Sequence, residues 1–155
     1  MPVRKLREFL DGQGVKYVTI SHSPAFTAQE IAASAHVSGK ELAKTVMVKI
    51  DGQMAMAVLP GSRSVDFGLL EAAAGAKKVD LAAEAEFREL FPECETGAMP
   101  PFGNLYGLPV FADESLTRDE QIAFNAGSHK ELVKLAWRDF ERIVQPRIAA
   151  FAKKP

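Results

Sequence analysis

The sequence is poor in the residues that build disulfides and metal sites. It contains one cysteine, Cys94, and three histidines, none of them at metal-ligand spacing. A single cysteine excludes an internal disulfide, and the histidine spacing gives no support for a zinc centre. Cys94 lies between Glu93 and Glu95, whose charges oppose formation of a thiolate nucleophile. We therefore expect no metal site, and a structural or incidental role for Cys94.

Long apolar runs and an excess of basic residues are also missing. No apolar stretch is close to the length of a membrane span, about 18 residues. The N-terminal segment lacks the apolar core of a signal peptide. The sequence therefore predicts a cytoplasmic protein with no membrane partner. Its formal net charge is −1, whereas proteins that hold long stretches of phosphate backbone usually carry a basic excess. If the chain binds RNA, we expect it to hold only a short part of it.

The composition that is present indicates one globular unit. Hydrophobic residues make up 47% of the chain and charged residues 25%, which is ordinary for a soluble domain. A chain of 155 residues can bury a core without disulfides. We expect a single domain over residues 1–155.

Hydrophobic periodicity predicts a mixture of helices and strands. Helices are predicted over residues 3–12, from Ala28, from Asp66 to Ala74, and over 82–91, 137–144 and 146–152. Strands are predicted over 17–20, 44–50, 53–59, 77–81, 109–112, 121–125 and 132–135. Asp51-Gly52 marks a hairpin turn between the second and third of these strands. A hairpin followed by crossovers through helices predicts a mixed sheet in an α/β or α+β fold.

The most informative stretch is the loop from Thr96 to Pro109. It combines three glycines (97, 103 and 107) with three prolines (100, 101 and 109) and therefore forms neither a helix interior nor a central strand. Its apolar residues are too many for a solvated linker. Glycines that bring backbone N–H groups close to a ligand, with prolines that stiffen the approach, are typical of an anion-binding or oxyanion-binding wall. The alternative is a cover over an edge of the core with no chemical role.

Several further motifs lie along the chain. They are Lys44-Thr45, Pro60-Gly61, Thr96-Gly97, Pro100-Pro101-Phe102-Gly103 and Asn125-Ala126-Gly127-Ser128-His129. In these motifs and in their order, the chain resembles the YbaK/prolyl-tRNA-synthetase-associated editing-domain family, from about His22 to about Leu135. Asp113-Glu114-Ser115-Leu116 is similar to a turn that follows a strand in many members of that family.

The resemblance implies a free-standing aminoacyl-tRNA deacylase, which hydrolyses the ester of a mischarged tRNA without a cofactor. It also implies a curled, barrel-like mixed sheet surrounded by helices. The active cleft is expected where the strand end at Lys44, the 97–103 loop and the 125–129 loop meet. The predicted catalytic residues are Lys44, Gly97, Gly103 and His129. The predicted substrate-binding residues are His22, Thr45, Pro60, Met99, Pro100, Pro101, Phe102, Asn125, Gly127 and Ser128.

The predicted mechanism depends on positioning, because the chain shows no Ser-His-Asp or Cys-His triad. In the family, water or a substrate group is the usual nucleophile. Backbone N–H groups of the 97–103 loop would stabilise charge on the carbonyl oxygen, where one well-aimed donor is worth roughly 3 kcal/mol. Lys44 would bind that oxygen or the phosphate of the terminal adenosine. His129 is the candidate general base, although binding a substrate group or ordering the loop explains it equally well; Asn125 and Ser128 either orient substrate or close the turn.

The sequence leaves the amino acid and the partner open. Alanine-specific free-standing members of the family often carry Asn directly after the conserved lysine, where this chain has Thr45. This difference weakens an assignment to Ala-tRNA. Cys-tRNA, Ser-tRNA and Thr-tRNA remain open as substrates. Two other functions fit the same residues: a non-catalytic module that binds the tRNA acceptor end or a tRNA synthetase, and a hydrolase or binder of a small acyl or nucleotide compound. The oligomeric state is not readable from the sequence.

Overall fold

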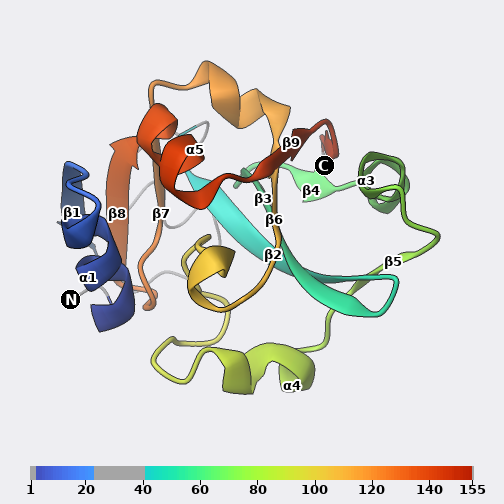
Figure 1. Cartoon of the computed structure of the whole chain (residues 1–155), viewed down its shortest axis with the longest axis horizontal. Helices are drawn as coiled ribbons and strands as arrows, with labels where there is room; N and C mark the ends of the chain where they lie inside the picture. Colours follow the sequence, from blue (N-terminus) through green and yellow to red (C-terminus); the bar gives the residue numbers. More distant parts are fainter. Residues whose placement is uncertain (1–2, 23–40, 155) are drawn as a thin grey trace.

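A computed structural model describes residues 3–22 and 41–154 of the chain (Figure 1). Its helices are α1 (Arg4–Gly12), α3 (Phe67–Ala74), α4 (Glu84–Phe87) and α5 (Trp137–Val144), with 3-10 turns at Arg88–Leu90, Gly103–Leu105 and Glu114–Arg118. Its strands are β1 (Tyr17–Ser21), β2 (Ala43–Ile50), β3 (Gln53–Pro60), β4 (Ser64–Val65), β5 (Val79–Leu81), β6 (Val110–Asp113), β7 (Gln121–Asn125), β8 (Glu131–Ala136), β9 (Arg147–Ala149) and β10 (Ala152–Lys153). The helix predicted from Ala28 lies outside the described residues.

The strands form two larger sheets that meet at the start of β2. One sheet has the order β5-β2-β3-β6-β9, in which β2 and β3 are an antiparallel hairpin and β3, β6 and β9 run parallel. The other is the antiparallel sheet β1-β8-β7. A parallel bridge between Leu42 and Ala123 joins them, and the Ala123 N–H donates to the Glu41 carbonyl at 2.9 Å. The predicted mixed α+β architecture is confirmed, although within the described residues the sheets do not close into a barrel.

Side chains alternate between the two faces of the five-stranded sheet and enter two apolar clusters. The main core receives Met47, Met56 and Val58, together with the inner faces of α1 and α5 and the ring of Phe102. The second core receives Val48, Ala57 and Leu59 from the other face, with residues of α3 and the C-terminal segment. Figure 1 shows this division: α1 and α5 lie on the side of the β1-β8-β7 sheet, and α3 lies at the opposite end of the molecule.

Local signals correctly define two of the helices. Asp66 Oδ1 accepts a hydrogen bond from the Leu69 N–H at 3.0 Å, and Gly75 ends α3 in the left-handed region with φ 64°. The helix over 137–144 is found at the predicted bounds, with Trp137, Phe140 and Val144 on its buried face. No helix in the described part of the chain is long and apolar enough to cross a lipid bilayer.

One other helix prediction is wrong, and one is confirmed only in part. Residues 146–152 form no helix, because Gln145 adopts a left-handed conformation (φ 54°) and the following residues pair as β9 with β6. In the segment 82–91, only Glu84–Phe87 is α-helical, and a 3-10 turn follows it. In both places the chain makes long-range contacts that the local pattern does not encode.

Candidate active site

Lys44 lies near the start of β2 and is half-buried. It pairs with Leu59 of β3, so its side chain shares the face of the second core. Burial lowers the pKa of Lys44. Two other lysines are in close ion pairs, Lys49 with Glu86 at 2.7 Å and Lys134 with Glu41 at 3.1 Å. Among the described residues, Lys44 has no such acidic partner, so its ammonium is available to an anionic group of a ligand.

Asn125 ends β7 close to the start of β2. Leu42 and Ala123 form an isolated parallel bridge between the two segments, and Lys44 and Asn125 each lie two residues further along the chain. Asn125 Oδ1 is buried and accepts no hydrogen bond from the described residues. A buried amide oxygen without a donor is costly. The bridge thus brings the start of β2 and the end of β7 together, and Asn125 Oδ1 has hydrogen-bonding capacity for a polar ligand.

Backbone hydrogen bonds clamp the 95–98 segment to the loop after Asn125. The Glu95 N–H donates to the Gly127 carbonyl at 2.8 Å, and the Gly127 N–H donates to the Ala98 carbonyl at 2.9 Å. Gly127 has φ 104°, and a Cβ there would overlap Val3, so both conformation and packing require glycine. The predicted meeting of these two loops is therefore present in the structure.

His129 adds a side-chain tie between the same two loops. It is 9% exposed, and its Nε2 lies 2.9 Å from the Thr96 carbonyl oxygen, which can only accept. Nε2 therefore carries a hydrogen. The Glu95 carboxylate accepts the His129 backbone N–H at 3.1 Å and lies 3.9 Å from Nε2. Gly97 (φ 85°) packs against this ring, since a Cβ there would lie 3.6 Å from His129 Cε1.

Few backbone donors of the glycine and proline loop remain for a ligand. The Ala98 N–H donates to the Glu95 carbonyl and the Phe102 N–H to the Pro100 carbonyl, and the two prolines have no N–H. Among the described residues, the N–H groups of Gly97, Met99 and Gly103 have no such acceptor. Gly103 is buried, and a Cβ there would lie 2.7 Å from the Leu108 carbonyl oxygen. Within the 97–103 segment, the free and less enclosed donors for an oxyanion are therefore the N–H groups of Gly97 and Met99.

Several residues predicted to contact substrate occupy packing positions. Phe102 is 0% exposed, and its ring packs against Phe140 at a centroid distance of 5.5 Å. Thr45 pairs with Val58 and therefore lies on the opposite face of β2 from Lys44. The others are buried at the end of β3 or in the loop beside Phe102: Pro60, Met99, Pro100 and Pro101. Their side chains are packed within the protein around the end of β3 and the ring of Phe102.

His22 and Ser128 both lie at the turn that follows Gly127. The His22 N–H donates to the Lys130 carbonyl at 2.8 Å, which sets His22 beside the turn at 128–130. Ser128 Oγ accepts a hydrogen bond from the Lys130 N–H at 3.3 Å, which ties Ser128 to the turn. Glu95 was not predicted as a site residue from the sequence. The one local signal for it was its position directly before the Thr96-Gly97 motif.

In the described part of the chain, neither Cys94 nor the acidic groups show the features of a thiolate nucleophile or of a metal centre. Burial raises the pKa of the Cys94 thiol, which disfavours the thiolate that a nucleophile needs. In the described ranges, no group of three or more His, Cys, Asp or Glu side chains is arranged to hold a metal ion.

Comparison with known proteins identifies the family. Residues 22–143 match the family model of the aminoacyl-tRNA editing domain. The chain belongs to this family. The Multifunctional Ser/Thr-tRNA deacylase ProXp-y of Escherichia coli (strain K12) is 29% identical over 155 residues, covering 97% of this chain and 92% of that protein. The predicted family and its enzyme class, an aminoacyl-tRNA deacylase, are confirmed.

Other relatives show how this editing domain is used and folded elsewhere. The Proline--tRNA ligase of Bacillus mycoides (strain KBAB4) is 25% identical over 88 residues, which are 57% of this chain and 15% of the ligase. The crystal structure of hypothetical protein APE2540 superposes with a TM-score of 0.86 at 24% identity, covering 97% of this chain and 100% of that one. A candidate trans-editing enzyme for prolyl tRNA synthetase gives a TM-score of 0.82 at 21% identity over 97% and 96% of the two chains. These structures share the fold of the editing domain.

Proposed function

We propose that this editing domain acts in trans, as a free-standing protein, and hydrolyses the ester of mischarged Ser-tRNA or Thr-tRNA. The observation that carries the mechanism is the half-buried Lys44, whose pKa is lowered by burial and which has no acidic partner among the described residues. The full-length relative named as a Ser/Thr-tRNA deacylase supports the choice of amino acid. Thr45 in place of the Asn found in alanine-specific members points the same way. Its site of action would be the cytoplasm, where charged tRNA is used.

In this mechanism, Lys44 binds the developing negative charge on the carbonyl oxygen of the ester. An ammonium in a partly desolvated site interacts with an anion more strongly than one in water. The N–H groups of Gly97 and Met99 supply further donors to the same oxygen. Water or a ribose hydroxyl is the nucleophile, and Asn125 Oδ1 accepts a hydrogen bond from a substrate hydroxyl or amine. No metal or organic cofactor takes part.

The substrate assignment is tested by deacylation of a panel of charged tRNAs. Purified protein is incubated with tRNA(Pro), tRNA(Ala) and tRNA(Thr), each charged with Ala, Cys, Ser or Thr. We expect the Ser and Thr esters to be hydrolysed faster than the Ala ester by roughly 10- to 100-fold, because a site that hydrogen-bonds the substrate hydroxyl discriminates against its absence. Faster loss of Ala or Cys would reassign the substrate. No loss of any ester, with tRNA binding retained, would select the non-catalytic binding module.

We further propose that His129 orders the two loops and does not transfer a proton. Its Nε2 hydrogen is directed to the Thr96 carbonyl, so replacement by Ala is expected to cost about 1 to 3 kcal/mol in unfolding free energy, as for an unmade buried hydrogen bond. Residual kcat of His129→Ala should keep the shape of the wild-type pH profile. A pH-rate inflection that is present in wild type and absent in His129→Ala would instead identify His129 as a general base.

A further inference from the structure

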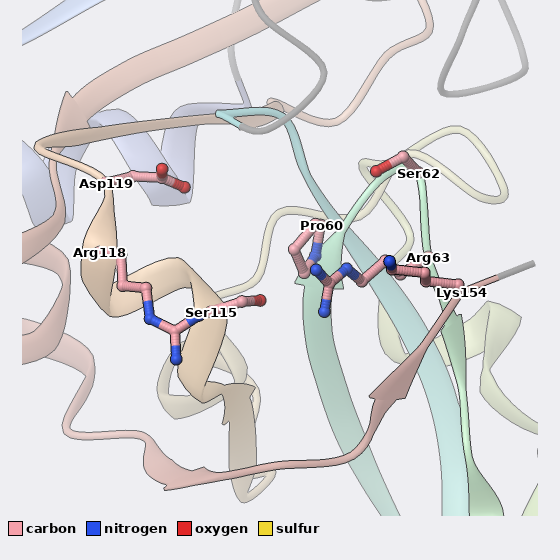
Figure 2. A pocket seen from close by; sticks show the side chains of 7 residues that line it. All are labelled: Pro60, Ser62, Arg63, Ser115, Arg118, Asp119 and Lys154. Carbon is pink, nitrogen blue, oxygen red and sulfur yellow. The ribbon is translucent and has the colours of Figure 1, made fainter.

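A basic pocket of about 790 Å³ opens at the C-terminal end of β3 (Figure 2). Its walls come from the turn after β3, the 3-10 turn after β6 and the C-terminal strand β10 with the residue that follows it. The lining residues are Pro60, Ser62, Arg63, Ser115, Arg118, Asp119 and Lys154. In Figure 2, the guanidinium groups of Arg63 and Arg118 reach into the space between these walls from opposite sides. Three lining side chains are thus cationic and one is acidic.

The three cations of this pocket differ from a lysine such as Lys49, which has a close acidic partner in Glu86 at 2.7 Å. Within the described residues, no ion pair involves Arg63, Arg118 or Lys154. An unneutralised group of cations around a pocket favours the binding of an anion.

Two of these cations lie just beyond a short strand pair. Lys153 pairs with Ser64 in the antiparallel β4-β10 ladder, and Lys154 and Arg63 are the residues next to this pair on the two segments. Both line the pocket, and an anion bound there would lower the repulsion between their like charges.

A buried carboxylate holds the walls of the pocket in place. Asp113 is 3% exposed, and its Oδ1 accepts the Phe151 and Ala152 N–H groups at 2.9 Å each. Its Oδ2 accepts the Ser115 N–H at 3.1 Å and the Ser115 hydroxyl. One side chain therefore fixes both the turn that carries Arg118 and the strand that leads to Lys154. Such preorganisation is expected of a binding site.

We propose that the pocket formed by Arg63, Arg118 and Lys154 binds backbone phosphates of the tRNA substrate next to the ester site. Guanidinium groups match phosphate oxygens in a bidentate geometry, and a pocket of this size is too large for a lone carboxylate. Pro60 at its edge pairs with Ala43, so the pocket lies at the same end of the β2-β3 hairpin as Lys44, although Ala43 and Pro60 are on the opposite face of the sheet from the Lys44 side chain. An acceptor strand that passes this end of the hairpin to reach Lys44 would bring its neighbouring phosphates to the pocket. This inference rests on the proposed deacylase function.

Two triple variants with the same loss of charge test the proposal. The pocket variant is Arg63→Gln, Arg118→Gln and Lys154→Gln; the control variant is Lys16→Gln, Lys77→Gln and Arg138→Gln, three exposed cations outside the pocket. Binding of uncharged tRNA(Pro) is measured by fluorescence anisotropy over a range of salt concentrations. Deacylation is measured on the charged tRNA and on a 3′-aminoacyl-adenosine that has no phosphate.

The pocket variant is expected to bind tRNA on the order of 100-fold more weakly at about 0.15 M salt. In a plot of the logarithm of the binding constant against the logarithm of the salt concentration, the magnitude of its slope should be smaller by about 2 to 3, as for three lost phosphate contacts. It should raise KM for the charged tRNA but hydrolyse the aminoacyl-adenosine like wild type. The control variant should change these values little. Equal losses in both variants would overturn the proposal.

Failure of this inference can be told apart from failure of the proposed function. Binding of uncharged tRNA needs no catalysis, so a pocket-specific loss of binding would support the phosphate site even without turnover. Turnover that is unaffected by the pocket variant would support the deacylase and reject the phosphate site. Saturable binding of inorganic phosphate or AMP to the pocket, with tRNA affinity unchanged in the pocket variant, would reject the tRNA assignment in favour of a small phosphate compound.

Discussion

Replacing Lys44 by methionine is expected to lower kcat for ester hydrolysis by roughly 10²- to 10³-fold, the loss typical of removing one donor to a developing oxyanion. Methionine keeps the apolar stem that packs beside Leu59 and removes only the ammonium. Because the Lys44 side chain is half-buried and has no acidic partner among the described residues, the free energy of unfolding should stay the same or rise. Single-turnover deacylation and urea unfolding measure the two quantities.

The matched control for this variant lies in the same strand. Lys49→Met removes a lysine from β2 on the face opposite Lys44, where it pairs with Glu86 at 2.7 Å. This change should leave kcat within about twofold of wild type, because an exposed ion pair contributes only about 0 to 1 kcal/mol and lies away from the proposed site. Wild-type turnover in Lys44→Met would remove Lys44 from the mechanism, and an equal loss in both variants would indicate a general effect on the sheet.

Replacing Asp113 by asparagine is expected to lower the free energy of unfolding by about 3 kcal/mol or more, because buried donors lose a charged acceptor. If the new amide NH2 group takes the place of Oδ2, this donor would face the Ser115 N–H and hydroxyl, which both donate to Oδ2 in the wild type. Asp139→Asn is the control, since Asp139 forms a 3.7 Å ion pair with Arg142 at the surface. That change should cost less than about 1 kcal/mol. Urea unfolding of the three proteins at neutral pH makes the comparison.

The pH dependence of this stability difference follows from the pKa of Asp113. Burial by itself would raise that pKa, but hydrogen bonds from the Ser115 side chain and from the backbone of Phe151, Ala152 and Ser115 outweigh it and hold the pKa below the ordinary 3.8. A carboxyl with a depressed folded pKa stabilises the fold fully above its unfolded pKa and loses this contribution as pH falls through the folded value. The difference between wild type and Asp113→Asn should therefore be constant above about pH 5 and shrink below pH 3.8. A difference that does not change down to about pH 2 would contradict this account.

Local sequence signals were sufficient for the elements whose causes lie within a few residues. The Asp51-Gly52 turn joins β2 and β3 as predicted, with Asp51 at φ 49° and Gly52 at φ 84°. Asp66 and Gly75 bound α3 because a cap and a left-handed glycine act on adjacent backbone groups. The region after Gln145 was predicted wrongly, because its strand depends on a pairing with β6 that lies more than thirty residues away in the sequence.

The family motifs located the candidate site but not the roles of all its residues. The order of motifs from Lys44-Thr45 to His129 correctly indicated an editing domain and loops that meet at Gly127. The pattern does not distinguish a ligand contact from a packing contact: Phe102 was predicted to bind substrate, and in the structure its ring is wholly buried. Neither Glu95, which accepts the His129 N–H, nor the basic pocket at Arg63 and Arg118 follows from any single segment.

The sequence by itself determined the family, the class of reaction and the elements with local signals, because short motifs, caps and turns act through neighbouring backbone atoms. Only the tertiary structure decided which face of β2 carries Lys44, which loop donors remain available, and that Arg63, Arg118 and Lys154 share one pocket. Those facts depend on strand register and on the buried carboxylate of Asp113. This carboxylate binds the N–H groups of Phe151 and Ala152, which lie 38 and 39 residues further along the sequence. Register and long-range hydrogen bonds result from the packing of the whole chain, and no local stretch specifies them.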